Sequence, residues 1–300
     1  MSYMHIENLY KAKEILLFKE CYAMEKIHGT SAHVSWNDGR LGFFSGGESR
    51  EKFCALFNAV ELSANFQTLG HNKVIVYGEA YGGKCQGMKA TYGDRLRFIA
   101  FEVLIGESWL NVPAADEVVK ALGLDFVAWK MIPTELEVLD SVMLDDSEQA
   151  VRNGMGPGHK REGIVLRPPI EVKMNNGARI IAKHKREDFQ ETKTSRPLDA
   201  DKLQVLEEAE AIANEWVTEI RLSHVLDAFP DAGMKQMGEI IKAMNVDIER
   251  EAAGEIVESK AARQAIGKRT AIMMKSRLKA NHVLETVQKE IDDSARGGHE

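Results

Sequence analysis

The residue with the clearest chemical potential in this sequence is Lys26, in the run Glu25-Lys26-Ile27-His28-Gly29-Thr30. A lysine amine that has lost its proton can attack a phosphorus atom and hold the attached group covalently. Because the ordinary pKa of lysine is about 10.4, a site that uses the amine near neutral pH must disfavour the ammonium form. Burial and nearby cations would do this.

Two further lysines, Lys183 and Lys185, lie two residues apart on an expected strand, so both side chains point to one face and His184 to the other. The pair could neutralise a polyphosphate and, if Lys26 lies close, lower the pKa of its amine. Taken alone, the two lysines also fit an exposed basic edge strand, which blunts aggregation. The other motifs favour the phosphate role.

Glu79 and Glu162 each adjoin a glycine in a strand-rich context, where a carboxylate can hold a hydrated divalent cation. We expect Mg²⁺ there, or Mn²⁺ in its place, to neutralise phosphate charge during a displacement at phosphorus. An isolated glutamate at a strand end is more often a surface residue, so this assignment depends on the remaining motifs.

The Lys-x-x-Gly pattern at Lys26 carries little information alone, because the chain holds 24 glycines and other lysines match it by chance. The other matches begin at Lys84, Lys120, Lys160 and Lys235. Context separates them: Lys26 follows a β-like run and reaches the next strand through Gly29, whereas a glycine-rich loop precedes Lys160.

Up to Thr192 the chain alternates short β-rich runs with turns, which is typical of an α+β domain with antiparallel sheets. The expected strands are Tyr22–Met24, Ser31–Trp36, Leu41–Phe44, Val74–Tyr77, Phe98–Leu104, Gly163–Arg167 and Arg179–Lys183. Asn37-Asp38-Gly39 forms a hairpin turn, and helices are expected over Glu51–Leu62 and Ala114–Leu122.

A polar stretch that ends at Pro197 precedes a region with helical periodicity. Apolar residues recur there at intervals of three or four, and Ala271–Ile291 contains neither proline nor glycine. The periodic positions are Leu203, Leu206, Ala209, Ala213, Trp216, Val217 and Ile220. We therefore expect one domain over residues 1–196 and a smaller all-helical domain over residues 197–300.

The formal net charge is −7, so any surface that binds phosphate must be a local positive patch on an acidic protein. The cysteines, Cys21, Cys54 and Cys85, are too widely spaced for a structural zinc or a disulfide framework, which suits a reducing compartment. The first residues lack a basic segment followed by an apolar run, and no apolar stretch is long enough to cross a bilayer. These features predict a cytoplasmic protein without a membrane partner.

In their order along the chain, these segments resemble the motifs of the covalent nucleotidyltransferases, most closely the ATP-dependent RNA ligase 2 family. Glu25–Thr30 resembles the nucleotide-attachment motif. The other similar segments are Tyr77-Gly78-Glu79, Tyr92-Gly93-Asp94 with Phe98–Glu102, Glu162–Pro168, Ala182–Lys185 with Phe189 and the exit to Pro197, and Trp216–Arg221. The resemblance covers nearly the whole chain, and its specificity lies in the ordered series.

The resemblance implies an adenylyltransferase domain and a three-step reaction. Lys26 would take AMP from ATP, the AMP would pass to a 5′-phosphate end, and a 3′-hydroxyl would displace it. Lys183 and Lys185 would be catalytic with Lys26, by stabilising phosphate charge. The expected nucleotide contacts are Glu25, Ile27, His28, Gly29, Ser45, Arg50, Glu79, Phe101, Glu162, Lys183 and Lys185, and Glu79 and Glu162 would also hold the metal.

Within this set, Phe101 would stack on adenine, and Phe98, three residues away on the same strand, would face the core. The expected partner is RNA ends, with a nicked duplex favoured, and the expected state is a monomer that acts in RNA repair.

Two departures from the family pattern concern the residues near the nucleotide. His28 stands where many ligases carry Asp, a feature that RNA ligase 2 proteins share. The usual arginine of the following motif is missing, so we expect a shifted Arg50, or Ser45 with the backbone of Gly46 and Gly47, to take its role. Ser31 stands where the family usually carries Asn.

Other functions remain open at this point. DNA ligases and capping guanylyltransferases resemble the same core, but in them a β-rich oligonucleotide-binding fold follows it, which the helical pattern after Pro197 disfavours. A nucleotide- or RNA-binding adaptor with an altered ligase core is the other alternative, because of the displaced arginine. The basic residues of the helical tail could hold RNA or form a solvated face: Lys260, Arg263, Lys268, Arg269, Lys275, Arg277 and Lys279.

Overall fold

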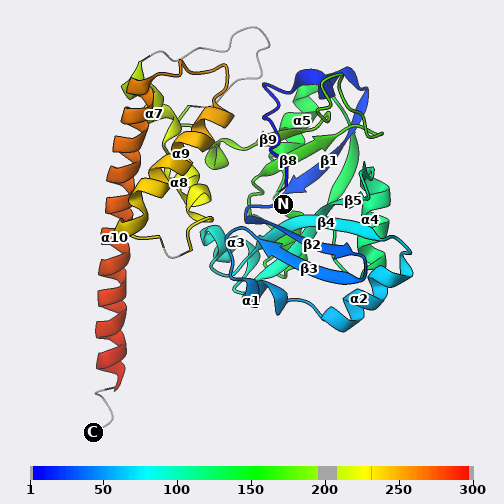
Figure 1. The fold of residues 1–300 in the computed structure, drawn as a ribbon, viewed down its shortest axis with the longest axis horizontal. Helices are drawn as coiled ribbons and strands as arrows, with labels where there is room; N and C mark the ends of the chain where they lie inside the picture. The colour runs from blue at the N-terminus through cyan, green and yellow to red at the C-terminus, as the bar shows by residue number, and fades with distance from the viewer. Residues whose placement is uncertain (1–2, 195–207, 231, 297–300) are drawn as a thin grey trace. The chain divides into compact units, whose positions relative to one another are not determined.

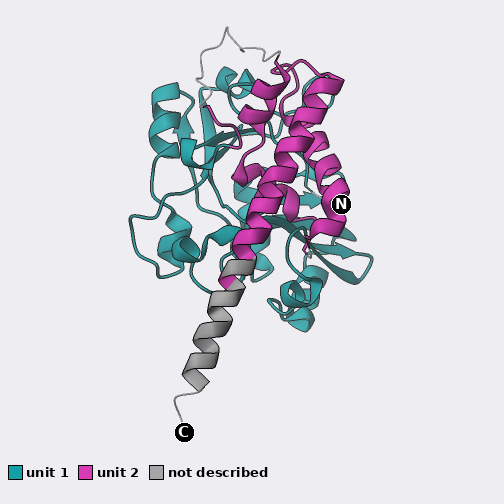
Figure 2. Cartoon of the chain, turned by 90° about the vertical axis from the view of Figure 1, so that its left-hand side faces the viewer, with its two compact units in different colours: residues 1–190, 195–200 teal, residues 191–194, 201–300 magenta. Residues whose placement is uncertain are grey.

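The computed structural model of this chain describes residues 3–194, 208–230 and 232–296. The chain divides into two compact units, residues 1–190 with 195–200 and residues 191–194 with 201–300 (Figure 2). The expected boundary at Pro197 and the periodic positions Leu203 and Leu206 lie outside the described residues. Each unit is therefore described by itself.

The first sheet of unit 1 has four antiparallel strands in the order β7-β1-β8-β9 (Figure 1). They are β1 (Glu20–Lys26), β7 (Trp129–Pro133), β8 (Gly163–Arg167) and β9 (Ala182–Lys185). Residues paired across strands share a face, so the pairs of Gly163 with Lys26 and with Lys185 put both lysines on one face. The other face packs on α5 (Leu136–Met143).

The second sheet of unit 1 has five antiparallel strands in the order β3-β2-β4-β5-β6. They are β2 (Thr30–Asn37), β3 (Arg40–Ser45), β4 (Lys73–Tyr81), β5 (Arg97–Ile105) and β6 (Ser108–Trp109). The predicted hairpin turn joins β2 to β3, and its residues Asp38 and Gly39 have φ of 46° and 82°. The prediction of antiparallel sheets with covering helices is confirmed.

One core cluster draws on both sheets and on α4 (Val112–Ala121). A short segment between α4 and β7 ties the sheets together, because Val127 N–H donates to Ala100 O at 2.9 Å and Glu25 N–H donates to Ala128 O at 2.8 Å. The strand that ends at Lys26 is therefore fixed relative to the second sheet.

The prediction of one helix over Glu51–Leu62 is wrong, because the structure has α1 (Arg50–Cys54) and α2 (Ala59–Thr68) instead. Asn58 causes the break: its side chain accepts a hydrogen bond of 3.3 Å from Glu61 N–H and caps α2.

Other boundaries moved by a few residues, and three α-helices and two strands of unit 1 were not predicted. The strand expected from Arg179 begins at Ala182, since Ile180 N–H donates to Val172 O in the preceding loop. The helix expected over Ala114–Leu122 is α4. The unpredicted helices are α3 (Lys89–Tyr92), α5 and α6 (Glu148–Arg152), and the unpredicted strands are β6 and β7.

The described part of unit 2 is helical and contains no strand. Its α-helices are α7 (Ala209–Trp216), α8 (Glu219–Leu226), α9 (Met237–Glu251) and α10 (Lys260–Arg296). The helices share an apolar core that includes Trp216, Ile240 and Ile266. The helical prediction for this region is confirmed, and Ala271–Ile291 falls within α10.

Some of the basic residues on α10 pair with neighbouring helices. Arg277 lies 4.0 Å from Glu219 of α8, and Lys268 lies 4.0 Å from Glu210 of α7. Lys275 and Lys279 are exposed and take part in no ion pair with a described residue. No described helix of either unit combines the length and the apolar character needed to cross a membrane.

Candidate active site

The carboxylate of Glu162 is the centre of a charged cluster. Lys26 Nζ lies 3.0 Å from Glu162 Oε2, Lys185 Nζ lies 3.0 Å from Oε1, and His28 Nδ1 lies 3.3 Å from Oε2. Four of the predicted site residues therefore meet here, although they come from three separate parts of the sequence.

The electrostatics of this cluster favour an ionised carboxylate. Glu162 is buried, and burial alone raises the pKa of a carboxyl group. Lys26, Lys185 and His28 outweigh that effect and hold the pKa of Glu162 well below its usual range. With two lysines around one carboxylate, the cluster keeps a positive excess that suits a phosphate group.

Gly163 allows Glu162 to lie beside Lys185. A Cβ at Gly163 would lie 2.1 Å from His184 O and 2.8 Å from Lys185 Cα, so no larger residue fits there. The close approach of β8 to β9 brings Glu162, which directly precedes β8, beside Lys185. The Glu-Gly pair of the sequence motif is thus explained by packing.

Lys183 and Lys185 share a face of β9, as the alternation predicted. His184 points the other way, where its Nε2 lies 2.7 Å from Asp140 Oδ1 on α5. The backbone of Lys183 also pairs with the N-terminal segment, since Lys183 N–H donates to Glu7 O and Leu9 N–H donates to Lys183 O, both at 2.9 Å. Both lysine side chains are buried.

Glu79 lies against the turn that follows Lys26. A Cβ at Gly29 would be 2.3 Å from Ala80 O and 2.9 Å from Glu79 Cγ, so only glycine lets the turn approach β4 this closely. Ile27, which directly follows Lys26, is buried in the core. Glu79 and Glu162 therefore both adjoin the Lys26 to Gly29 turn.

Glu25 occupies a different environment from Lys26, because successive side chains of β1 point to opposite faces. Its carboxylate accepts hydrogen bonds from Ser147 Oγ at 2.5 Å and from Gln149 N–H at 3.1 Å, at the start of α6. Burial raises the pKa of Glu25, and the bonds from Ser147 and Gln149 partly offset the rise. Hydrogen bonds thus hold the Glu25 carboxylate at the start of α6.

Phe101 is the extra residue of a β-bulge in β5. The adjacent β4 residues Tyr77 and Gly78 pair with Glu102 and Ala100, so Phe101 between them has no partner of its own on β4. Phe101 and Glu102 consequently lie on the same face as Tyr77.

Tyr3 covers this face. Its ring lies 4.9 Å from Phe101 and 5.1 Å from Tyr77, centroid to centroid, and its hydroxyl donates to Glu102. Phe98 packs with Phe53 and other core residues on the opposite face. The prediction that Phe98 and Phe101 face opposite sides is confirmed.

Glu102 also anchors two arginines that were not predicted as site residues. Arg167 Nη1 lies 2.8 Å and Arg179 Nη2 2.5 Å from Glu102 Oε1, and the Arg179 guanidinium stacks 4.3 Å from the centre of the Trp109 ring. Arg167 lies inside the Glu162–Pro168 motif, which could have drawn attention to it. Tyr3 and Arg179 lie 99 and 77 residues from Glu102 in sequence, and no local signal links them to it.

Ser45 and Arg50 do not join the Lys26 cluster. Ser45 pairs with Ala32, and therefore shares the core face of the sheet with Phe43. Arg50 is exposed in the first turn of α1 and makes no ion pair with any residue that the structure describes. Phe44, which directly precedes Ser45, lies on the same face as Tyr77 instead.

A divalent cation would find two carboxylates, Glu79 and Glu162, at the Lys26 to Gly29 turn. Within the described ranges no group of three or more His, Cys, Asp or Glu side chains forms a ready metal cage. Mg²⁺ commonly binds through one or two carboxylates together with substrate phosphates and water, so this donor set fits it.

Comparison with known proteins places this geometry in a family. The RNA ligase family model matches residues 19–185, which include every strand of both sheets and the Lys26 cluster. A variant of Naegleria gruberi RNA ligase solved with ATP and Mn superposes with a TM-score of 0.51 at 16% identity, covering 63% of this chain and 57% of that chain. The same ligase solved with PPi gives a TM-score of 0.50 at 16% identity, with the same coverage.

These solved structures share the fold of this chain, which spans less than two thirds of their length. No curated protein sequence matches it. The family model, however, covers more than half of the 300 residues. The chain belongs to the RNA ligase family.

Proposed function

We propose that this protein is an ATP-dependent RNA ligase that joins 3′-hydroxyl and 5′-phosphate ends through AMP carried on Lys26. The observation that supports this most strongly is the convergence of Lys26, His28 and Lys185 on Glu162. Solved structures of the similar Naegleria ligase contain ATP with Mn, or PPi, which are the nucleotide, metal and product that such a reaction needs.

In the first step, Lys26 releases its ammonium proton to solvent, and the Nζ lone pair forms a bond to the α-phosphorus of ATP. The bond to pyrophosphate breaks, pyrophosphate leaves with the electron pair, and the nitrogen releases a second proton to solvent. The ion pair of Lys26 with Glu162 must open first. An incoming triphosphate competes for both lysines, so Lys185 can turn to phosphate oxygens while His28 keeps its place at Glu162.

In the second step, an oxygen of an RNA 5′-phosphate attacks the AMP phosphorus, the P–N bond breaks and Lys26 regains a proton. In the third, a 3′-hydroxyl attacks the activated 5′-phosphate, loses its proton and releases AMP. Lys183 and Lys185, buried on one face of β9, stabilise phosphate charge in each step.

Glu79 and Glu162 would hold Mg²⁺ or Mn²⁺, whose charge stabilises the phosphate oxygens when bound. Phe101 would stack on adenine beside Tyr3 and Tyr77. With Ser45 on the core face and Arg50 exposed, the role of the missing arginine falls to the lysines in this proposal. Glu25, held by α6, would border the base.

The proposed partner is a nick in duplex RNA, sealed by a monomer in the cytoplasm during RNA repair. The exposed Lys275 and Lys279 on α10 would contribute to phosphate binding, because they have no acidic partner among the described residues. A DNA ligase is less well supported, since the described part of unit 2 is helical.

Sealing assays with a 5′-labelled nicked duplex test the assignment. Four nicks should be compared, with ribose or deoxyribose on each side, together with single-stranded RNA. The proposal expects the all-RNA nick, or one with a ribose 3′-end, to be sealed fastest. Preferred sealing of the all-DNA nick would contradict the RNA assignment, and binding without AMP transfer or sealing would favour an adaptor.

A further inference from the structure

A row of aromatic and imidazole rings crosses the second sheet on the face that carries Glu79 and Phe101. Phe44 of β3 pairs with His33 of β2, His33 pairs with Tyr77 of β4, and Tyr77 pairs with the bulge at Phe101 and Glu102 of β5. Paired residues share a face, so the row follows the strand order β3-β2-β4-β5. One end of it is the proposed adenine site.

The other end of the row is open. β3 is an edge strand, and Phe44 is 37% exposed, which is unusual for a phenylalanine on a sheet face. Its ring is stacked on His33, with centroids 5.0 Å apart and planes 18° apart. One face of the Phe44 ring therefore rests on His33, and the solvent side remains available.

His33 adds a polar atom without a partner. Its side chain is 8% exposed, and Nδ1 is buried and makes no hydrogen bond with any described residue. The His33 ring is thus fixed by burial and supports one face of Phe44, so a ligand can stack only on the other face.

The position of Phe44 and His33 relative to Glu79 agrees with the geometry that the sealing step needs. Ser31 pairs with Glu79, and His33 is two residues further along β2 on the same face, about 7 Å away. In a displacement at phosphorus the attacking and leaving oxygens lie on opposite sides. If AMP leaves from the side of Phe101, the attacking 3′-hydroxyl must come from the other side of Glu79, which is the side of β2 and β3.

We infer that Phe44 and His33 form the binding surface for the terminal nucleobase of the RNA strand that supplies the 3′-hydroxyl. The base stacks on the exposed face of Phe44, and the His33 ring supports the other face of Phe44. This inference rests on the proposed function, since it names a substrate subsite of that reaction. Stacking on an aromatic ring tolerates any base, because each has a π-face, so the subsite accepts an end of any sequence.

The test uses the full chain and a nicked RNA duplex with 2-aminopurine as the 3′-terminal base and a 5′-adenylylated end across the nick. This substrate needs no ATP, so it isolates the last step. The variants are Phe44→Leu, which removes the ring, and Phe44→Trp, which keeps it. Arg40→Ala, an exposed change on the same strand, is the control.

We expect the 2-aminopurine fluorescence to be quenched on binding of the wild type, Phe44→Trp and Arg40→Ala, and much less by Phe44→Leu. For Phe44→Leu, kcat/KM of sealing should fall by about fivefold or more, which is the low end for loss of one base stack. Equal quenching and equal kcat/KM for Phe44→Leu and the wild type would overturn the inference.

Two outcomes keep this inference separate from the proposed function. If the wild type neither seals the adenylylated nick nor transfers AMP from ATP, the proposed function fails. If the wild type does both and Phe44→Leu quenches and seals like the wild type, only the subsite fails. A 4-thiouridine at the 3′-end gives a second measurement, because its light-induced crosslink should map to the peptide that contains Phe44.

Discussion

Lys26 Nζ donates a hydrogen bond of 3.0 Å to Glu162 Oε2, across 136 residues of sequence. The nucleophile proposed for AMP transfer is thus held, before nucleotide arrives, by the carboxylate that also binds Lys185. Glu162 acts as an anchor for the cations of the site, and its removal should affect both folding and chemistry.

Glu162→Ala leaves Lys26, Lys185 and His28 without their shared anion. Loss of one partner from a buried charge cluster typically costs about 3–5 kcal/mol, so the free energy of unfolding in urea should fall by that order. Glu187→Gln, an exposed change nearby, is the control and should stay within about 0.5 kcal/mol of the wild type. Equal stability of Glu162→Ala and the control would show that Lys26, Lys185 and His28 are not paired with Glu162 in solution.

Substitutions on the two faces of β9 should have different effects on the rate of AMP transfer. Lys183→Ala and Lys185→Ala should each slow lysyl-AMP formation by about 100-fold, because each removes a cation that stabilises phosphate charge. His184→Ala removes the contact with Asp140, on the face of β9 opposite the lysines, and should retain the wild-type rate. Single-turnover AMP transfer from labelled ATP measures all three, and a His184→Ala rate as low as that of Lys185→Ala would argue against the assignment.

Gly29→Ala should be disruptive for a steric reason. The added methyl group would lie 2.3 Å from Ala80 O, so the turn after Lys26 must move, at a cost of about 1–3 kcal/mol. Gly238→Ala is the matched control, since a Cβ there meets nothing within 4 Å and Ala favours a helix. Thermal unfolding of the two variants should shift in opposite directions, and a normal melting temperature with normal activity for Gly29→Ala would refute the close approach.

The pair of Phe44 and His33 also predicts a pH effect. Burial lowers the pKa of His33 from 6.5 to about 4. Between those values the unfolded chain binds the proton and the folded chain does not, so the His33 contribution to the free energy of unfolding is full above pH 6.5 and falls as the pH drops toward 4.

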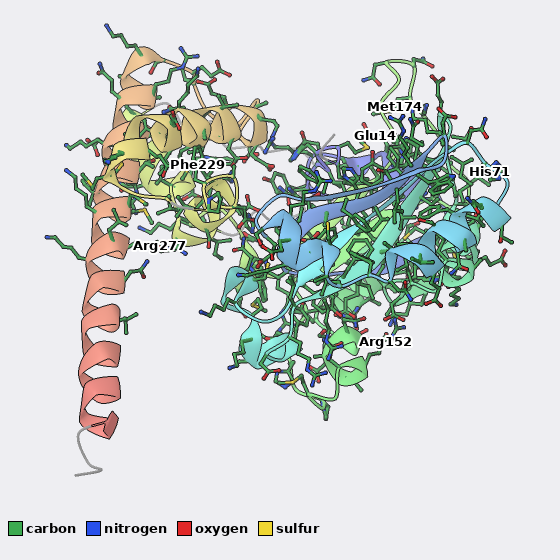
Figure 3. The ribbon with its side chains drawn as sticks, turned by 60° about the horizontal axis from the view of Figure 1, so that its bottom comes forward. Glu14, His71, Arg152, Met174, Phe229 and Arg277 are labelled. Carbon is green, nitrogen blue, oxygen red and sulfur yellow. The ribbon has the colours of Figure 1, made fainter. Side chains whose placement is uncertain are left out.

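His33→Gln should therefore lose less stability than the wild type when urea unfolding is compared at pH 6.5 and pH 4. His71→Gln, a change at an exposed histidine (Figure 3), should follow the wild type. Parallel pH profiles for His33→Gln and the wild type would mean that His33 titrates normally.

The sequence predicted what alternation and close packing determine locally. The period of two along β9 separates Lys183 and Lys185 from His184, and the glycines after Lys26 and Glu162 mark places where a Cβ would strike the backbone. Strand pairing then brings Lys26 and Lys185 to the same glycine, Gly163. Ordered motifs could identify the glycines because the backbone itself imposes that residue type, and the charged residues next to them could then be assigned from the motif.

Features that depend on distant packing were not predictable in this way. The bulge at Phe101 turns two consecutive side chains to one face, which no period-two pattern signals. The contact of Tyr3 with Glu102 joins segments 99 residues apart. Ser45 was expected at the phosphate because the motif lacks its arginine, but the pairing with Ala32 directs it to the core face.

The most direct test of the central claim is to locate AMP on the protein. After incubation with α-labelled ATP and Mg²⁺, peptide mass spectrometry should find one AMP on Lys26, with none on Lys26→Ala and normal labelling of Lys84→Ala, the variant of another Lys-x-x-Gly match. Added pyrophosphate should remove the label, because the first step is reversible. AMP on a different lysine, or undiminished labelling of Lys26→Ala, would contradict the account.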